Sequence, residues 1–268
     1  LIVDWILVRF AHVRFWYVQA DGDIFSWLVA HGMAFDVDVF DPNVWVNQVQ
    51  GPLSMEFLAA LADDGLPKPF DYFGLSNIRI GGQLIIITRT GWTGELGWEY
   101  YADPELVDCK RLWLDIMNAG ERFGLVHASL DSMEIRRIEA AILNAGSDFD
   151  ASTNPYQVGL GQFVAVDKKH FIGREALEEE KASGVAMKQV GLVLETRGVM
   201  RSHQKVIVEG AGEGEVTSGT FSPTLQYSIA IARVPAATGD TAQVDLRGKL
   251  TDVRVIKLPF VRNGQKQF

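Results

Sequence analysis

The chain has 268 residues, 47% of them hydrophobic and 22% charged, with a formal net charge of −9 at pH 7. This length can bury a substantial core and divide into domains, whereas the acidic balance argues against a nucleic-acid or anionic-membrane surface, since both need a basic face. The single cysteine, Cys109, excludes an internal disulfide and a cysteine-rich zinc site, so we expect a cytoplasmic protein.

The first stretch, 1–10, reads Leu-Ile-Val-Asp-Trp-Ile-Leu-Val-Arg-Phe and predicts a strand buried on both faces. Asp4 interrupts this apolar run. A carboxylate inside such a strand is costly unless it is paired or functional. The alternative is that Asp4 lies at a frayed chain start. The local pattern alone therefore does not decide whether Asp4 is functional.

The next segments alternate between strand and helix patterns. Residues 14–20 predict a second strand, and 23–31 a short helix with apolar residues on one face. Residues 35–40, Phe-Asp-Val-Asp-Val-Phe, alternate with the period of a half-exposed strand. Residues 45–50 predict a further strand. The chain thus favours a mixture of helices and sheets.

A glycine-rich segment at 89–101 is the most distinctive stretch: Arg-Thr-Gly-Trp-Thr-Gly-Glu-Leu-Gly-Trp-Glu-Tyr-Tyr. Strands are predicted on both sides of it, at 83–88 and 98–101. Glycine permits tight turns and close approach of a ligand to the backbone. A flat aromatic residue beside a fixed carboxylate suits a planar heterocycle with two parallel N–H donors. A plain glycine-rich hairpin with surface tryptophans is the competing interpretation.

The remaining chain predicts two helices and then a β domain. Asp103 as N-cap and Pro104 at the first position predict a helix that ends at Gly120. A second helix is predicted over 129–143. From residue 188 onward the pattern changes to short strands separated by turn residues, which is typical of a small barrel or sandwich. These strands are predicted at 189–195, 205–208, 214–218, 228–233, 242–246 and 251–257.

The segment 89–99 closely resembles the Arg-Thr-Gly-Tyr-Thr-Gly-Glu-Asp-Gly-x-Glu signature of the glycine-cleavage T-protein family of tetrahydrofolate-dependent aminomethyltransferases. The segment 171–177, Phe-Ile-Gly-Arg-Glu-Ala-Leu, matches another family motif. The resemblance begins at Asp4, and the N-terminal part of the family pattern is missing from the sequence. It implies an α+β, three-lobed, folate-binding fold with a C-terminal small β-barrel. The expected lobes are 1–46 with 156–187, then 47–155, and finally 188–268.

The resemblance also implies functional residues. Asp4 falls on the family's catalytic aspartate, and Glu99 on the glutamate that holds the pterin ring through paired hydrogen bonds. We expect the cofactor-binding set to be Glu99, Trp92, Glu95, Arg136 and Tyr100. Met133 stands where aminomethyltransferases have an arginine that contacts the folate, and a thioether cannot supply the guanidinium's charged fork. Arg136 is an alternative. Further departures from the family pattern are Trp5, Gln157 and Gln162.

Three functions follow from the resemblance. The favoured one is a tetrahydrofolate-dependent one-carbon transferase of the T-protein type, which takes an aminomethyl or methyl group from a small-molecule donor or a lipoyl-type carrier protein. The second is a tetrahydrofolate-dependent demethylase of an S-, O- or N-methyl donor, which the departures at Met133, Gln157, Gln162 and Trp5 motivate. The third is a non-catalytic folate-binding protein. Its relatives carry a cysteine in a motif that reads Lys169 to Glu175 here, without a cysteine.

Overall fold

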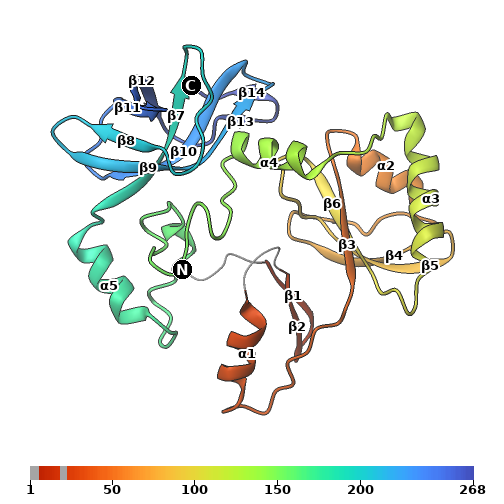
Figure 1. Cartoon of the computed structure of the whole chain (residues 1–268). Helices are drawn as coiled ribbons and strands as arrows, with labels where there is room; N and C mark the ends of the chain where they lie inside the picture. Colours follow the sequence, from red (N-terminus) through yellow and green to blue (C-terminus); the bar gives the residue numbers. More distant parts are fainter. Residues whose placement is uncertain (1–5, 19–22) are drawn as a thin grey trace. The chain divides into compact units, whose positions relative to one another are not determined.

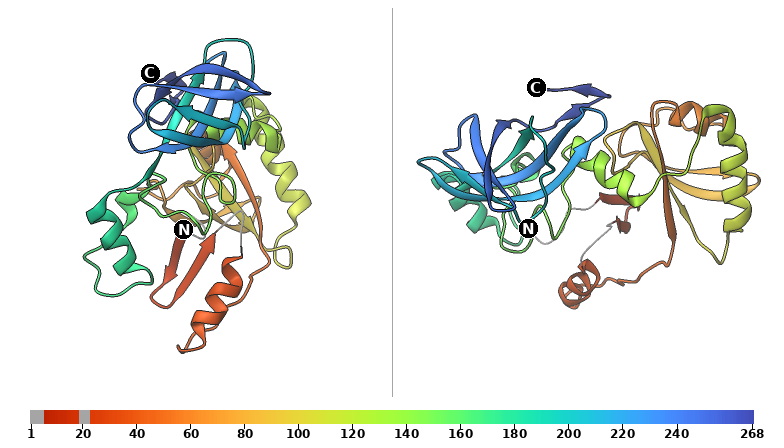
Figure 2. Two further views of the ribbon diagram at one scale, coloured as in Figure 1. Left: turned by 60° about the vertical axis from the view of Figure 1, so that its left-hand side comes forward. Right: turned by 45° about the horizontal axis from the view of Figure 1, so that its top comes forward.

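The structure, a computed structural model, describes residues 6–18 and 23–268. These residues form two compact units, one made of 6–18 and 23–133 and the other of 134–268. Figures 1 and 2 show the elements of each. Within the described ranges, no helix is long and apolar enough to cross a membrane.

The first unit is built on an antiparallel sheet with the strand order β3-β6-β5-β4 (Figure 1). Helices α2 and α3 pack against one of its faces and close an apolar core. The elements of this unit are β1 (Ile6–Ala11), β2 (Arg14–Val18), α1 (Ile24–Gly32), β3 (Trp45–Gln50), α2 (Ser54–Leu61), β4 (Leu75–Ile80), β5 (Gln83–Thr88), β6 (Gly97–Ala102), α3 (Cys109–Gly120) and the 3-10 turn η1 (Glu121–Phe123).

Strand β6 divides its side chains between the two faces of this sheet. Trp98 and Tyr100 point into the core beneath the helices and are 0% and 4% exposed. Because successive side chains of a strand alternate, Glu99 and Tyr101 lie on the opposite face. The pairing of β5 with β6 sets Thr88 opposite Glu99, as the predicted hairpin requires. This alternation decides which groups can share a site.

The hairpin of β1 and β2 contributes to that opposite face. The Trp16 ring lies 5.7 Å from the ring of Tyr101. In the described part of the first strand, however, only Val8 is buried, and β1 pairs with β2 alone. The prediction of a strand enclosed on both faces is therefore wrong for Ile6–Ala11. Asp4 and Trp5 lie outside the described residues.

Two other local predictions are also wrong. Residues 35–40 form no strand, although they alternate, because none of the described strands pairs with their backbone. The helix predicted from Asp103 begins later, at Cys109, with the Asp108 carboxylate accepting the Arg111 N–H as N-cap. Asp103 instead accepts the N–H of Glu105 within a turn. In both cases the local pattern alone does not determine the structure.

The glycine-rich loop between β5 and β6 is built around Gln50. The Gln50 side chain donates to the carbonyl of Thr90 at 3.1 Å and accepts from the Thr93 hydroxyl at 3.1 Å. A Cβ at Gly91 or Gly97 would meet the Gln50 amide at 2.1–2.4 Å. Gly94 is needed for another reason, since its φ is +72°. The glycines at 91 and 97 therefore make room for a side chain of the protein itself.

We expect Gly97→Ala to destabilise the protein by about 1–3 kcal/mol, because the new methyl group displaces the Gln50 amide and its hydrogen bonds. Denaturant unfolding of the variant measures this. The double variant with Gln50→Ala should lose little more than Gln50→Ala alone, since the clash is then gone. Fully additive losses would contradict this account of the loop.

The second unit contains a closed six-stranded barrel in the order β10-β7-β12-β11-β8-β9 (Figure 2). This confirms the predicted C-terminal barrel, and the helices and sheets together confirm the α+β class. The elements of this unit are α4 (Leu130–Glu139, which begins in the first unit), the 3-10 turn η2 (Gly161–Phe163), α5 (Arg174–Ser183), β7 (Met187–Leu194), β8 (Lys205–Val208), β9 (Gly212–Ser222), β10 (Tyr227–Pro235), β11 (Thr241–Leu246), β12 (Lys249–Ile256), β13 (Val261–Arg262) and β14 (Gln265–Lys266).

Buried charges at the C-terminal end of α4 join this part of the helix to the barrel. Arg137, 1% exposed, forms an ion pair with the fully buried Asp148 and donates to Ser218 at 2.7 Å. Glu139 accepts from the hydroxyl groups of Ser222 and Thr224. These contacts give the barrel residues of β9 and its following turn a structural role. The three-lobe division at 46/47, 155/156 and 187/188 stays a prediction.

Candidate functional site

Glu99 lies on the sheet face opposite α2 and α3, half-buried among hydroxyl groups. Thr90 donates its hydroxyl to Glu99 Oε2, and the Tyr101 hydroxyl donates to the same oxygen at 3.4 Å. Thr88 completes the cluster through contacts with both Thr90 and Tyr101. Every hydrogen bond that described residues give Glu99 ends on Oε2, which leaves Oε1 to accept other donors.

The environment of Glu99 is unusual for a carboxylate. Burial raises the pKa of Glu99, and the hydrogen bonds from Thr90 and Tyr101 offset part of this effect. Burial, with the nearby Glu99 charge, also raises the pKa of Tyr101 to about 12, so its hydroxyl stays a donor. Among the described residues no cation is paired with Glu99. A half-buried carboxylate without a cation is costly for stability and marks a functional candidate.

Gln48 joins the cluster from the neighbouring strand. It is the register partner of Glu99 in the pairing of β3 with β6. Its Oε1 accepts the backbone N–H of Trp92 at 3.3 Å, while its Nε2 contacts the sulfur of Met133. Gln48 thus fixes the Trp92 loop beside the Glu99 face. Met133, at the departure from the family's arginine, lies at the same place.

Aromatic rings surround the carboxylate. Trp16 from β2 packs on Tyr101, and Phe10 packs edge-on against Trp16 with 4.5 Å between ring centres. The pKa of the Tyr72 phenol is raised, mainly because Tyr72 is partly buried and secondly because the Glu99 carboxylate lies nearby. Flat apolar walls beside a carboxylate with one unengaged oxygen can hold a planar heterocycle by its paired N–H groups.

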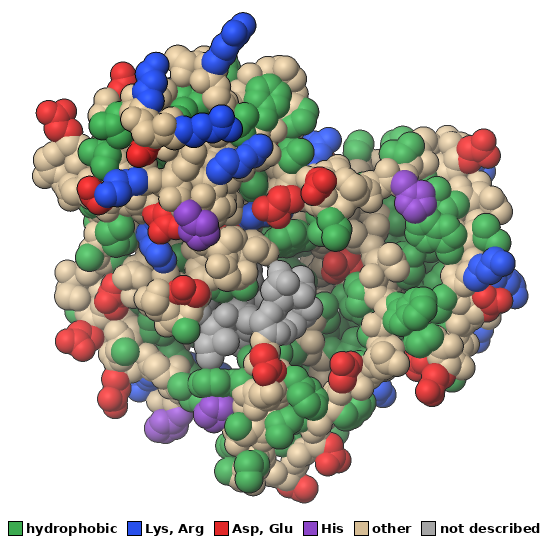
Figure 3. Space-filling model, viewed as in Figure 1, with side chains coloured by type: hydrophobic (Ala, Val, Ile, Leu, Met, Phe, Trp, Pro, Cys, Tyr) green, Lys and Arg blue, Asp and Glu red, His purple; other side chains and the backbone are tan. Residues whose placement is uncertain are grey.

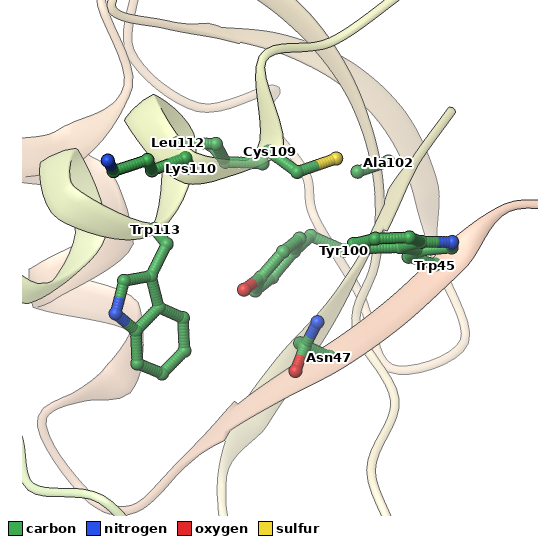
Figure 4. A pocket seen from close by; sticks show the side chains of 8 residues that line it. All are labelled: Trp45, Asn47, Tyr100, Ala102, Cys109, Lys110, Leu112 and Trp113. Atoms are coloured by element: carbon green, nitrogen blue, oxygen red, sulfur yellow. The ribbon is translucent and has the colours of Figure 1, made fainter. Parts of the chain in front are cut away.

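Tyr100, predicted to bind the cofactor, does not lie with Glu99. It is on the helix side of β6, where its hydroxyl points toward a separate hollow of about 330 Å³ (Figure 4). Adjacent residues of a strand face opposite ways, so Tyr101 rather than Tyr100 lies on the face of Glu99, and the role of Tyr100 toward a cofactor stays a prediction. The hollow is lined by Trp45, Asn47, Tyr100, Ala102, Cys109, Lys110, Leu112 and Trp113.

The other predicted residues lie in different surroundings. Glu95 is half-buried in the loop, where its backbone N–H donates to Thr93. Arg136 belongs to the second unit, is exposed, and lies 3.6 Å from the Glu139 carboxylate. Asp4 lies outside the described residues. Within the first unit, the structure therefore brings Trp92 and Glu99 together through Gln48, and their roles toward a cofactor stay predictions.

The departures at Gln157 and Gln162 lie in the second unit. The Gln157 side chain accepts the N–H of Asn154 at 3.2 Å and closes a local turn. Gln162 is exposed on η2.

Sequence reasoning missed Thr88, Thr90, Tyr101, Gln48 and Trp16. The first three could have been found, because period-two alternation from Glu99 selects Tyr101, and the strand before the loop ends at Thr88 with Thr90 two positions later. Gln48 and Trp16 are distant in the sequence, and no local pattern connects them to Glu99. Only the strand pairing and the hairpin packing reveal them.

Two family models match the chain. The model described as the GCVT N-terminal domain matches residues 1–168. The model of the glycine cleavage T-protein C-terminal barrel domain matches residues 188–262, which contain most of the observed barrel.

Curated relatives and a solved structure agree with these matches. The aminomethyltransferase of Chromobacterium violaceum is 52% identical over 182 residues, 67% of this chain and 49% of its own length. That of Stenotrophomonas maltophilia is 38% identical over 248 residues, 90% of this chain and 65% of its own. The chain thus spans about half to two-thirds of the length of these relatives.

The crystal structure of glycine cleavage system aminomethyltransferase T from Bartonella henselae superposes with a TM-score of 0.85 at 28% identity, over 99% of this chain and 74% of that one. This likeness confirms the predicted T-protein-like fold. The chain belongs to the glycine-cleavage T-protein family.

Proposed function

We propose that this chain binds the pterin ring of tetrahydrofolate through Glu99 and serves a tetrahydrofolate-dependent aminomethyl or methyl transfer. The observation that supports this most is the half-buried Glu99 carboxylate, which has an unengaged Oε1 and no cationic partner among the described residues. The names of the curated relatives support the aminomethyl form of the reaction. Isothermal titration of the chain with tetrahydrofolate tests the proposal, and no heat of binding would contradict it.

The residues present fit such a ligand. Glu99 offers a carboxylate edge to two parallel N–H groups, and Trp16 and Tyr101 supply flat aromatic surface beside it. Thr90 and Tyr101 fix the carboxylate by bonding one oxygen from one side. Trp92, Glu95 and Arg136 remain proposed contributors to the site. When bound, tetrahydrofolate supplies the nucleophilic nitrogen that accepts the one-carbon unit.

In this proposal the chain positions the cofactor and the donor and stabilises charge during the transfer. Glu99 orients the heterocycle, because its paired hydrogen bonds are directional, and orientation lowers the entropic barrier to reaction. Asp4 is the proposed catalytic residue, which would position the donor and stabilise charge or take a proton. Asp4→Asn should abolish turnover while leaving tetrahydrofolate affinity nearly unchanged. Unchanged turnover would favour a purely binding role.

The affinity for tetrahydrofolate should depend on pH through Glu99. Only the ionised carboxylate accepts both N–H groups, so affinity should fall as the pH falls through the Glu99 pKa. Since burial raises that pKa, the loss should begin at a higher pH than for an ordinary glutamate. Titrations over a pH series in wild type and Glu99→Gln measure this. The variant should show weak binding without the same pH dependence, and a matching dependence would assign the titration to another group.

A demethylase is the second candidate, and the contact of Met133 with Gln48 next to Glu99 favours it. An uncharged thioether at this place suits a different donor or folate orientation from one held by a guanidinium. Product analysis separates the two reactions. Aminomethyl transfer gives methylene-tetrahydrofolate and ammonia, whereas demethylation gives methyl-tetrahydrofolate. A lipoyl-type carrier protein as donor and a cytoplasmic location remain parts of the first proposal.

A further inference from the structure

A hollow of about 330 Å³ opens on the helix side of the first unit's sheet, on the opposite face from Glu99 (Figure 4). Strands β3 and β6 bound it on one side, and the first residues of α3 bound it on the other. In Figure 3 hydrophobic side chains gather at the surface beside α3. The volume lies within the range of small-molecule sites in proteins, and none of the side chains that contact Glu99 lines the hollow.

Three aromatic side chains line this hollow: Trp45, Tyr100 and Trp113. Trp45 and Trp113 are 56% and 36% exposed, so part of each ring is open to a ligand. Trp113 also packs against the His127 ring, with 4.6 Å between ring centres, and this contact restrains its orientation. Flat rings with few rotatable bonds bury a planar ligand at a small cost in conformational entropy. The walls therefore favour an aromatic ligand over an aliphatic one.

The Tyr100 side chain is 4% exposed, yet its hydroxyl group has no hydrogen-bond partner among the described residues. The hydroxyl points into the hollow (Figure 4). Buried tyrosine hydroxyl groups usually have a partner. Burial raises the pKa of Tyr100 to about 12, so the hydroxyl keeps its proton near neutral pH and can donate a hydrogen bond. A ligand that carries an acceptor would take the place of water at this group.

Two further groups at the hollow indicate the charge of that acceptor. Lys110 is exposed in the first turn of α3 and forms no ion pair with the described residues. The Asn47 amide, on β3, can also donate a hydrogen bond. The described residues that line the hollow include no aspartate or glutamate. Because the polar groups are donors and one of them is a cation, they favour an anionic acceptor.

We propose that this hollow binds a planar aromatic carboxylate. The ligand's ring packs against the two tryptophans, and its acid group accepts hydrogen bonds from Tyr100 and Lys110. This inference does not depend on tetrahydrofolate binding, because the hollow and Glu99 lie on opposite faces of the sheet.

Cys109 is the single cysteine of the chain and lines the hollow, so its alkylation reports whether the hollow is occupied. The probe is 2-naphthoate, added to the chain of 268 residues. Calorimetric titration should give a saturable, equimolar complex. Mass spectrometry should show that iodoacetamide labels Cys109 about tenfold more slowly when the probe is present at about ten times its Kd. Absence of a saturable complex, or a complex that leaves the labelling rate unchanged, would overturn the proposal.

A pair of matched compounds tests the ligand class. The neutral 2-naphthamide keeps the rings but lacks the charge, and cyclohexanecarboxylate keeps the charge but lacks the rings. Each should bind about tenfold more weakly than 2-naphthoate, or weaker still, because it loses one of the two kinds of contact. Equal affinity of either compound would contradict an aromatic carboxylate as the ligand.

Matched variants locate the contact. Tyr100→Phe removes a hydroxyl group without a partner among the described residues, so it should leave the melting temperature unchanged and weaken 2-naphthoate binding about tenfold. Lys110→Gln should weaken binding and remove most of its salt dependence. Tyr101→Phe, on the other face of the sheet, and Lys181→Gln, on α5, should bind the probe like wild type. Equal losses in both sets of variants would contradict the assigned hollow.

Further measurements separate this site from the one at Glu99. Glu99→Gln should bind 2-naphthoate like wild type, and saturating tetrahydrofolate should leave the affinity for the probe unchanged. Competition between the two ligands would place them at one site and overturn the proposal of a second. A chain that binds the probe but no tetrahydrofolate would contradict the proposed function and leave this inference standing.

The remaining alternative is that a second copy of the chain covers the hollow. Sedimentation velocity should give the same oligomeric state for wild type and Trp113→Ser. A dimer that this variant abolishes would assign the hollow to self-association and overturn the proposal.

Discussion

Glu99→Gln is expected to weaken tetrahydrofolate binding by about a hundredfold. The amide keeps the size of the side chain but replaces one acceptor oxygen with an N–H donor, so one of two charge-assisted hydrogen bonds is lost and the other is weakened. Each such bond contributes about 1.5–3 kcal/mol, and about 1.4 kcal/mol corresponds to a tenfold change. Anaerobic calorimetric titration measures the change directly.

The same variant carries a built-in check on folding. Because burial raises the pKa of Glu99, the folded chain holds this proton more tightly than the unfolded chain does. The carboxyl therefore favours the folded state at low pH, and this contribution is lost as pH rises through the raised pKa. Glu99→Gln should melt at a higher temperature than wild type at neutral pH, while binding less. Glu121→Gln, an exposed glutamate on η1, should change neither property.

A variant that lost both stability and binding would show that Glu99 supports the fold instead of a ligand. If affinity survived in a stable Glu99→Gln protein, the pterin anchor would have to lie elsewhere. Thermal melting separates the first outcome from the expected result, because both give weak binding in the calorimetric titration.

Asp148→Ala is expected to cost about 3–5 kcal/mol of unfolding free energy, because it leaves the Arg137 guanidinium buried without its ion-pair partner. Asp148 also accepts from the Thr217 hydroxyl and the Asn144 N–H, so the loss reaches strand β9 and the 144–148 turn. Urea unfolding, followed by circular dichroism, gives the change. An effect below about 1 kcal/mol, the range of exposed ion pairs, would mean that water replaces the lost partner.

An exposed pair provides the control. Arg174 and Glu178 are 37% and 44% exposed and 2.8 Å apart on α5, so Glu178→Ala should cost less than about 1 kcal/mol. The double variant Arg137→Met with Asp148→Leu should lose less than Asp148→Ala alone, because no charge is then left buried. A larger loss in the double variant would show that Arg137 contributes mainly through its other contacts.

Much of the fold could be predicted because its signals are local. The short strands after residue 188 are separated by glycine and polar turns, and each predicted strand overlaps an observed strand of the barrel. The hairpin of β5 and β6 likewise follows from two apolar runs on either side of a glycine-rich loop. The strand predicted at 35–40 is absent because alternation alone does not supply a neighbouring strand. A strand without hydrogen-bond partners does not form.

The candidate site was predicted only at its centre. The motif identified Glu99, but its supporting hydroxyl groups come from both sides of the loop, and Gln48 comes from a strand about fifty residues earlier. The glycines at 91 and 97 illustrate the limit. Their spacing correctly indicates a close approach to the backbone, yet the approaching group is Gln50 rather than a ligand. Sequence spacing reveals that space is needed and does not reveal which group fills it.

The closure of the six-stranded barrel has a consequence for how the chain opens. Each of its strands is hydrogen-bonded on both sides, whereas among the described strands β3 and β4 of the open sheet each have one neighbour. Amide protons in β7 and β10 should therefore exchange with deuterated water most slowly, and those on the outer side of β3 much sooner. The outer edges of β3 and β4 are also where partly opened molecules would adhere to one another.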